Sequence, residues 1–140
     1  MLLSQLLGMN GEHSIVKEFT ILISDKNRNI REYLRRELVL EGYRVRVAKN
    51  AFEILAYIFH REPIDLAIID PELPDADEVH LIEKMNNRLP ILPIIFHYIS
   101  RDDIRHIDVL GPVNYVEKEG HSIEQLKKAV SELLKGSLQD

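Results

Sequence analysis

Three residues far apart in this sequence have side chains suited to handling a phosphoryl group: Asp25, Asp70 and Lys118. Each follows a short apolar run that is typical of a buried β-strand. Two carboxylates and an ammonium group around one cleft can hold a hard cation through oxygen ligands and neutralise an incoming phosphoryl group. A carboxylate can also be the nucleophile in phosphoryl transfer, which gives an acyl phosphate. This chemistry requires a fold that brings the three side chains together.

Asp70 is the most informative of the three, because it stands directly behind a continuous apolar run at 66–69. Pro71 and Pro74 then end regular structure, so a loop begins at the carboxyl end of the predicted strand. In open α/β sheets, ligands bind at such loops. A lone Asp at a strand end is more often only solubilising. Its functional interpretation therefore depends on Asp25 and Lys118.

Short apolar runs alternate with segments of helical periodicity along the whole chain. The runs predict strands at 19–24, 43–48, 66–69, 93–96 and 114–117. The periodic segments predict helices at 28–40, between Asn50 and Pro63, at 79–87, after Ser100 (a short helix holding Ile104 and Ile107), and from Ser122 through Leu134. The buried stripe of the second predicted helix consists of Ile54, Leu55, Ile58 and Phe59. The predicted fold class is α/β: a single doubly wound (βα)5 domain with a five-stranded parallel sheet in flavodoxin-like order. We expect the first, third and fifth strands to be neighbours in that sheet, which would gather the three site residues in one crevice.

The length of 140 residues fits one domain, and we divide the chain into an N-terminal arm at 1–17, a domain at 18–136 and a tail at 137–140. The net charge of −5 argues against direct nucleic-acid binding by this chain. The absence of cysteine excludes a disulfide framework and a thiolate metal site. No apolar run approaches the length of a membrane span. These features predict a cytoplasmic protein that does not enter the membrane.

The arm at 1–17 begins with an apolar stretch, but it lacks the basic region and long apolar core of a signal peptide. Two interpretations stay open. The arm is loosely held, with Met9 as an alternative start, or it contains a short amphipathic helix that docks on a partner.

From residue 19 to residue 135 the sequence resembles the receiver domain of two-component response regulators. The resemblance rests on Ile-Leu-Ile-Ser-Asp ending at Asp25, Asp-Leu-Ala-Ile-Ile-Asp-Pro-Glu-Leu-Pro around Asp70, and Gly-Pro-Val-Asn-Tyr-Val-Glu-Lys ending at Lys118. It implies that Asp70 accepts a phosphoryl group from a sensor histidine kinase or phosphotransfer protein and that Lys118 contacts this group. It further implies Mg²⁺ binding by Asp25, Asp70 and the backbone carbonyl of Glu72. The position of Tyr115 belongs to the family's switch surface.

Several positions depart from the family's pattern. Lys26 stands where the family usually has a second acidic residue, which replaces a charge that attracts metal with one that repels it. We therefore expect weak Mg²⁺ binding, unless Lys26 points away. Glu72 either restores a ligand or pairs with Lys26 and fills the place of the metal.

The family's hydroxyl residue at the end of the fourth strand is also missing. Its position falls at Tyr98, or at His97 if one residue is skipped, and Ser100 substitutes only if the loop shifts. The interval from Tyr98 to Gly111 is two residues shorter than in the family, so we expect a shortened helix there.

Three hypotheses follow. The first is a receiver domain in two-component phosphorelay signalling, phosphorylated on Asp70 and acting on a downstream protein through a switch surface with His97, Tyr98, Ser100 and Tyr115; homodimerisation stays open. The second is a pseudo-receiver scaffold, independent of phosphorylation, that binds no Mg²⁺. The third is a small hydrolase with Asp70 as nucleophile, which is disfavoured because Glu72 stands where such phosphatases usually have a second Asp. On the first two hypotheses, the protein is not an enzyme.

Overall fold

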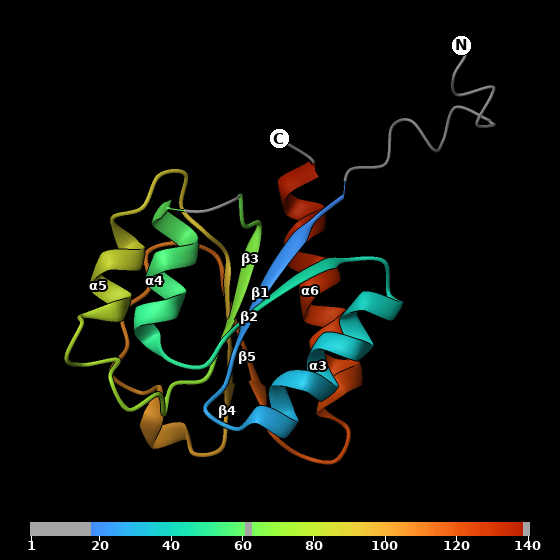
Figure 1. The fold of residues 1–140 in the computed structure, drawn as a ribbon, viewed down its shortest axis with the longest axis horizontal. Coiled ribbons are helices and arrows are strands. Elements are labelled where there is room, and N and C mark those ends of the chain that lie inside the picture. The colour runs from blue at the N-terminus through green and yellow to red at the C-terminus, as the bar shows by residue number, and fades with distance from the viewer. Residues whose placement is uncertain (1–17, 61–62, 139–140) are drawn as a thin grey trace, which may run out of the picture.

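The computed structural model of this chain describes residues 18–60 and 63–138, and it contains one five-stranded parallel sheet (Figure 1). The strand order is β2-β1-β3-β4-β5, which confirms the predicted doubly wound topology. The elements in chain order are β1 (Thr20–Ser24), α3 (Arg28–Leu40), β2 (Arg44–Ala48), α4 (Ala51–His60), β3 (Leu66–Ile69), α5 (Leu81–Asn86), β4 (Ile94–Tyr98), the 3₁₀ turn η1 (Arg101–Asp103), β5 (Val113–Glu117) and α6 (Ser122–Leu138).

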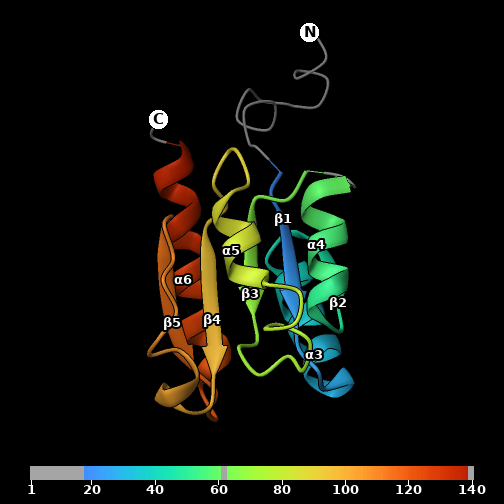
Figure 2. The same cartoon turned by 90° about the vertical axis from the view of Figure 1, so that its left-hand side faces the viewer.

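The sheet lies between two layers of helices, as the view in Figure 2 also shows. Helices α3 and α6 cover one face, where their apolar side chains pack on Ile21, Ile23 and Ile68. Helices α4 and α5 cover the other face and pack on Leu22 and Ile69. The side chains of successive strand residues therefore pack against opposite helix layers, because side chains in a strand alternate between its two faces. None of the described helices is long and apolar enough to cross a bilayer.

Local signals in the sequence account for the ends of the first two helices. The side chain of Asn27 accepts hydrogen bonds from the backbone N–H groups of residues 29 and 30, so it is the N-cap of α3. Gly42, with φ of +100°, ends that helix in the left-handed region that glycine adopts without strain. The Asn50 side chain accepts from the N–H of Glu53 in the first turn of α4. These caps hold the helices beside the strand ends.

Two expectations about helices were wrong. The segment after Ser100 forms only the 3₁₀ turn η1, and Ile104 and Ile107 lie beyond it. Both side chains still pack on the core, so the shortened segment keeps its apolar contacts without completing a helix. Helix α5 begins at Leu81 rather than at residue 79, because His80 has a φ of +53°, which no α-helix accommodates.

Candidate functional site

The predicted site residues lie at the carboxyl ends of three parallel strands. Asp25 follows β1, Asp70 follows β3 and Lys118 follows β5. The expectation that these strands are all neighbours was wrong, because β4 lies between β3 and β5. Lys118 nevertheless reaches both carboxylates. Its backbone N–H donates to the carbonyl oxygen of Tyr98 at the end of β4, and its long side chain spans the remaining distance.

The ammonium group of Lys118 bridges the two carboxylates. Its Nζ lies 2.8 Å from Oδ2 of Asp25 and 3.6 Å from Oδ1 of Asp70. Both aspartates are 1% exposed, so the cluster is almost fully withdrawn from water. Buried carboxylates require paired charges and hydrogen bonds, and Lys118 supplies the only cation that contacts both within the described chain.

Backbone N–H groups complete the surroundings of the carboxylates. Oδ1 of Asp25 accepts from the N–H of Asn27 at 2.9 Å, and Oδ1 of Asp70 accepts from the N–H of Glu72 at 2.9 Å. Oδ2 of Asp70 accepts from the N–H of Lys26 at 3.3 Å. Each of the four carboxylate oxygens therefore already has at least one donor, and the loops after β1 and β3 are tied to each other through Asp70.

A serine hydroxyl behind the site joins the same two strands. Ser24 donates to the carbonyl oxygen of Ile68 at 3.0 Å and accepts from the N–H of Asp70 at 3.2 Å. Ser24 is buried, so the two bonds are shielded from water. This contact, which sequence reasoning missed, fixes the register of Asp25 against Asp70. A hydroxyl directly before Asp25 was the only signal for it.

Lys26 does not enter the buried cluster. Its Nζ forms an ion pair with Oε1 of Glu72 at 3.1 Å, and the side chain of Lys26 is 50% exposed. The hydrogen bond and charge of Glu72 raise the pKa of Lys26, with smaller contributions from Asp70 and Asp25. Of the two arrangements considered for Glu72, the structure contains the pairing with Lys26. The pair lies at the solvent side of the site.

Two carboxylates of the cluster are the groups that would hold a divalent cation. Asp25 and Asp70 offer two carboxylates, but the ammonium of Lys118 neutralises one of these charges. The carboxylate of Glu72 is engaged with Lys26. Among residues 18–60 and 63–138, no group of three or more His, Cys, Asp or Glu side chains is arranged to hold a metal ion. Mg²⁺ keeps several of its waters and binds proteins through one or two carboxylates, so Asp25 and Asp70 are the side chains that would hold it here, in competition with the ammonium of Lys118.

The end of β4 carries no small hydroxyl group. His97 and Tyr98 are both buried. Nε2 of His97 lies 3.3 Å from the Ser122 hydroxyl, and its Nδ1 has no hydrogen-bond partner among the described residues. Burial, together with the charge of Lys118, lowers the pKa of His97 to about 4, although Asp70 opposes the shift. His97 is thus neutral at physiological pH.

The remaining residues of the predicted switch surface differ in position. Ser100 is exposed and accepts from the N–H of Asp102 as the cap of η1. Tyr115 is exposed, and its ring stacks on Phe96 with centroids 5.8 Å apart. The ring of Tyr98 lies under the guanidinium of Arg101 at 5.8 Å. Of the four switch residues, only Ser100 and Tyr115 are accessible in this conformation.

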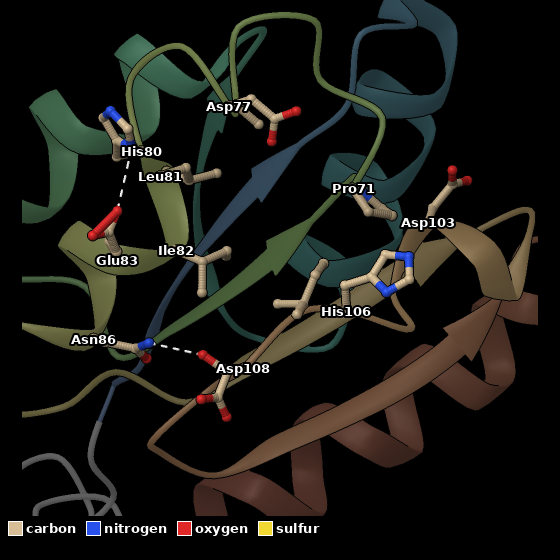
Figure 3. A pocket seen from close by; sticks show the side chains of 12 residues that line it. Pro71, Asp77, His80, Leu81, Ile82, Glu83, Asn86, Asp103, His106 and Asp108 are labelled. Atoms are coloured by element: carbon tan, nitrogen blue, oxygen red, sulfur yellow. Dashed lines mark hydrogen bonds and ion pairs between the residues drawn. The ribbon is translucent and has the colours of Figure 1, made fainter.

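A pocket of about 550 Å³ opens beside the site, between α5 and the segment after η1 (Figure 3). Pro71, the residue next to Asp70, is part of its wall. His80 pairs with Glu83 at 3.3 Å, and the Asn86 amide donates to the carbonyl oxygen of Asp108 at 2.8 Å. The signal for this pocket in the sequence was the shortened interval between Tyr98 and Gly111.

The family model of the response regulator receiver domain matches this chain over residues 21–131. Among curated proteins, the chain is 31% identical over 115 residues to "Response regulator GtcR" of Aneurinibacillus migulanus, covering 81% of this chain and 47% of that protein. It is 29% identical over 117 residues to "Virulence transcriptional regulatory protein PhoP" of Salmonella typhimurium, covering 82% and 51%. The chain thus spans about half the length of the curated relatives it matches.

Solved structures show the same similarity. A CheY-like receiver domain protein from Methanospirillum hungatei is 26% identical, with a TM-score of 0.69, covering 89% of this chain and all of that one. The response regulator TrrA from Thermotoga maritima, determined in complex with Mg²⁺-BeF, is 28% identical with a TM-score of 0.68, covering 82% and 98%.

Proposed function

This chain belongs to the response regulator receiver domain family, and we propose from that premise that it accepts a phosphoryl group on Asp70 and signals by binding another protein. Receiver domains of this family act in two-component signal transduction. The proposed partners are a sensor histidine kinase or phosphotransfer protein on the input side and a protein target on the output side. The module itself has no catalytic turnover.

The observation that carries the proposal is the contact of Lys118 with both Asp25 and Asp70 at the carboxyl end of the sheet. Oδ2 of Asp70 has the longest hydrogen bond of the cluster, 3.3 Å, and is therefore the oxygen most available to a phosphorus atom. Lys118 lies where it can neutralise the oxygens of the incoming group.

The transfer proposed for Asp70 is a displacement at phosphorus. A carboxylate oxygen of Asp70 forms a bond to phosphorus while the bond from phosphorus to the donor's histidine nitrogen breaks. The bonding electron pair stays on that nitrogen. We further propose that Mg²⁺ binds this site only weakly, because the family's second acidic residue is Lys26 here and Glu72 is paired with it.

The experiment is phosphorylation of the full chain with a small acyl phosphate donor and Mg²⁺, read out by intact mass. We expect the mass of one phosphoryl group to be added to a fraction of the wild type and to none of the Asp70→Asn variant. Asp102→Asn, an exposed aspartate away from the cluster, is the matched control and should be modified like the wild type. No adduct on the wild type, or equal modification of Asp70→Asn, would refute phosphorylation of Asp70.

A second candidate function is favoured by the ion pair between Lys26 and Glu72. In this alternative, the protein is a scaffold whose binding is independent of phosphorylation and which binds no Mg²⁺.

Calorimetric titration with Mg²⁺ alone separates the two candidates. The scaffold predicts no binding by the wild type, whereas a phosphorylated receiver predicts weak binding. In either case Lys26→Asp should raise the affinity tenfold or more, since a like charge is replaced by a potential ligand. Lys135→Asp makes the same change in net charge at an exposed position of α6 and should leave the Mg²⁺ affinity unchanged. Tight binding by the wild type would contradict both the scaffold and the proposed weak site.

A further inference from the structure

An apolar groove lies between α4 and α5, on the side of these helices away from the sheet. Its volume is about 350 Å³, and apolar side chains dominate its walls, with two basic groups at the rim; the lining residues are Phe52, Leu55, Ala56, Phe59, His60, Val79 and Lys84. No residue of the Asp25, Asp70 and Lys118 cluster contributes to it. The groove is therefore separate from the phosphoryl site.

Two aromatic rings in this groove are unusually accessible. Phe52 is 67% exposed and Phe59 is 44% exposed, although both are on a helix whose other face is packed on the core. The helical pattern predicted that Phe59 belongs to the buried stripe of α4, and the described residues provide no cover for it. Exposed apolar patches of this kind mark surfaces that bind another segment or molecule.

We propose that the segment at residues 2–7 of the same chain docks in this groove. The segment contains four leucines separated by one polar pair, Ser4 and Gln5. On a helix, leucines at 2, 3, 6 and 7 fall on one face and the polar pair falls on the other. A helix that presents such a face fits an apolar groove.

The start of β1 lies at the same end of the molecule as the end of α4, whose last residue lines the groove. The N–H of Thr20 donates to Oδ2 of Asp65 at 2.8 Å, and the N–H of Asp65 donates to the carbonyl oxygen of Thr20 at 2.9 Å. Asp65 follows closely behind His60, the last residue of α4, which lines the groove. Figure 2 shows the start of β1 and this end of α4 at the same end of the molecule.

Ten residues, 8–17, connect the proposed docking segment to the described domain. A stretch of ten residues spans at most roughly 33 Å when fully extended, and an unstructured chain of that length has a root-mean-square span of roughly 18 Å. Such a tether gives an effective concentration on the order of millimolar for the groove. The tethered segment therefore has an advantage over a second copy of the chain at micromolar concentration.

Disulfide trapping tests the proposal directly, because the chain contains no cysteine. Leu6→Cys combined with Ala56→Cys places one thiol on the leucine face and one in the groove. We expect an intramolecular disulfide that forms at least about tenfold faster than in the matched pair Gln5→Cys with Ala56→Cys. Equal rates in the two pairs would overturn docking of the leucine face. Disulfide-linked dimers in place of the intramolecular product would assign the groove to a second copy and overturn docking within one chain.

A fluorescence measurement keeps the test independent of cysteine geometry. The chain has no tryptophan, so Leu6→Trp adds a single reporter. We expect blue-shifted emission relative to Gln5→Trp, and loss of the shift when Phe59→Ser is added. Equal emission from the two reporters, or a shift that survives Phe59→Ser, would refute the proposal. Neither experiment involves Asp70, so a failure here leaves the proposed phosphorylation intact.

Discussion

The two sides of the crevice at the carboxyl end of the sheet differ in how closely they follow the receiver pattern. On one side, Asp25, Asp70 and Lys118 form a buried, fully hydrogen-bonded cluster. On the other side, β4 ends in two buried rings, His97 and Tyr98, and the helix that should follow is a single 3₁₀ turn. Relative to the receiver pattern, the residues proposed to receive a phosphoryl group are present, whereas the residues expected to respond to it are different.

The residues proposed to accept the phosphoryl group and those expected to respond to it therefore depend on different kinds of contact. The cluster depends on one long side chain and a few backbone N–H groups, so it tolerates changes at β4. The response side depends on side chains that must change position. A buried Tyr98 that packs on the core has little freedom to do so without opening a cavity. Substitutions on each side in turn should therefore have different effects.

The largest effect is expected from removal of the cation that joins the cluster. Lys118→Met leaves two buried carboxylates facing each other, so we expect a loss of about 3 kcal/mol in the free energy of unfolding. The matched control is Lys26→Met, which breaks the solvent-screened ion pair with Glu72 and should destabilise the fold much less than Lys118→Met does. Urea unfolding of the three proteins at pH 7 measures both. Equal losses would mean that burial does not distinguish the two ion pairs.

A smaller, pH-dependent effect is expected from the response side. The pKa of His97 in the folded protein is about 4, below its ordinary value of 6.5, so the unfolded chain binds more protons between these pH values. The stability associated with neutral His97 is therefore complete above pH 6.5 and is lost as the pH falls toward 4. From pH 7 to pH 5 the loss attributable to His97 is about 2 kcal/mol.

The measurement is urea unfolding of the wild type and His97→Val at both pH values. The variant should lose about 2 kcal/mol less than the wild type over this interval. His106→Val, a change at an exposed histidine, is the control and should keep the dependence of the wild type. The same pH dependence in His97→Val and the wild type would show that His97 is not held neutral by burial.

The sequence predicted the cluster because its residues stand directly behind apolar strands, where the sheet alone determines their position. It also predicted the flavodoxin-like strand order, but the expectation that the first, third and fifth strands are all neighbours overlooked the fourth strand, which that order places between the third and the fifth. Lys118 contacts Asp70 across β4 because its long side chain spans the distance. The exposure of Phe59 was not predicted from the sequence for a related reason. Periodicity finds the apolar stripe of a helix, but it does not show how wide a stripe the neighbouring layer covers.

The outcome at Lys26 was not predictable from residue types alone. A lysine beside two aspartates could pair with either, and only the backbone of the loop determines which acid its side chain reaches. In the structure the N–H of Lys26 is directed toward Asp70 while its ammonium is directed toward Glu72. One residue thus contributes to the buried cluster through its backbone and to the solvent side through its charge.

The smallest expected effect comes from the loop that follows β3, which begins at Asp70 and contacts the start of α4. Asp75 accepts hydrogen bonds from the N–H groups of Ala51 and Phe52 at 2.8 and 3.0 Å, so it caps the start of α4 from a distant part of the chain. We expect Asp75→Ala to cost about 1 kcal/mol in urea unfolding and to speed hydrogen exchange in the first turn of α4. Asp77→Ala, two residues away in the same loop, should do neither.

If both variants behave alike, the loop does not anchor α4. If only Asp75→Ala lowers the stability and speeds the exchange, the loop after Asp70 is anchored to the start of α4 as well as to the Asp70 site. A rearrangement around Asp70 would then be transmitted to α4 rather than to β4.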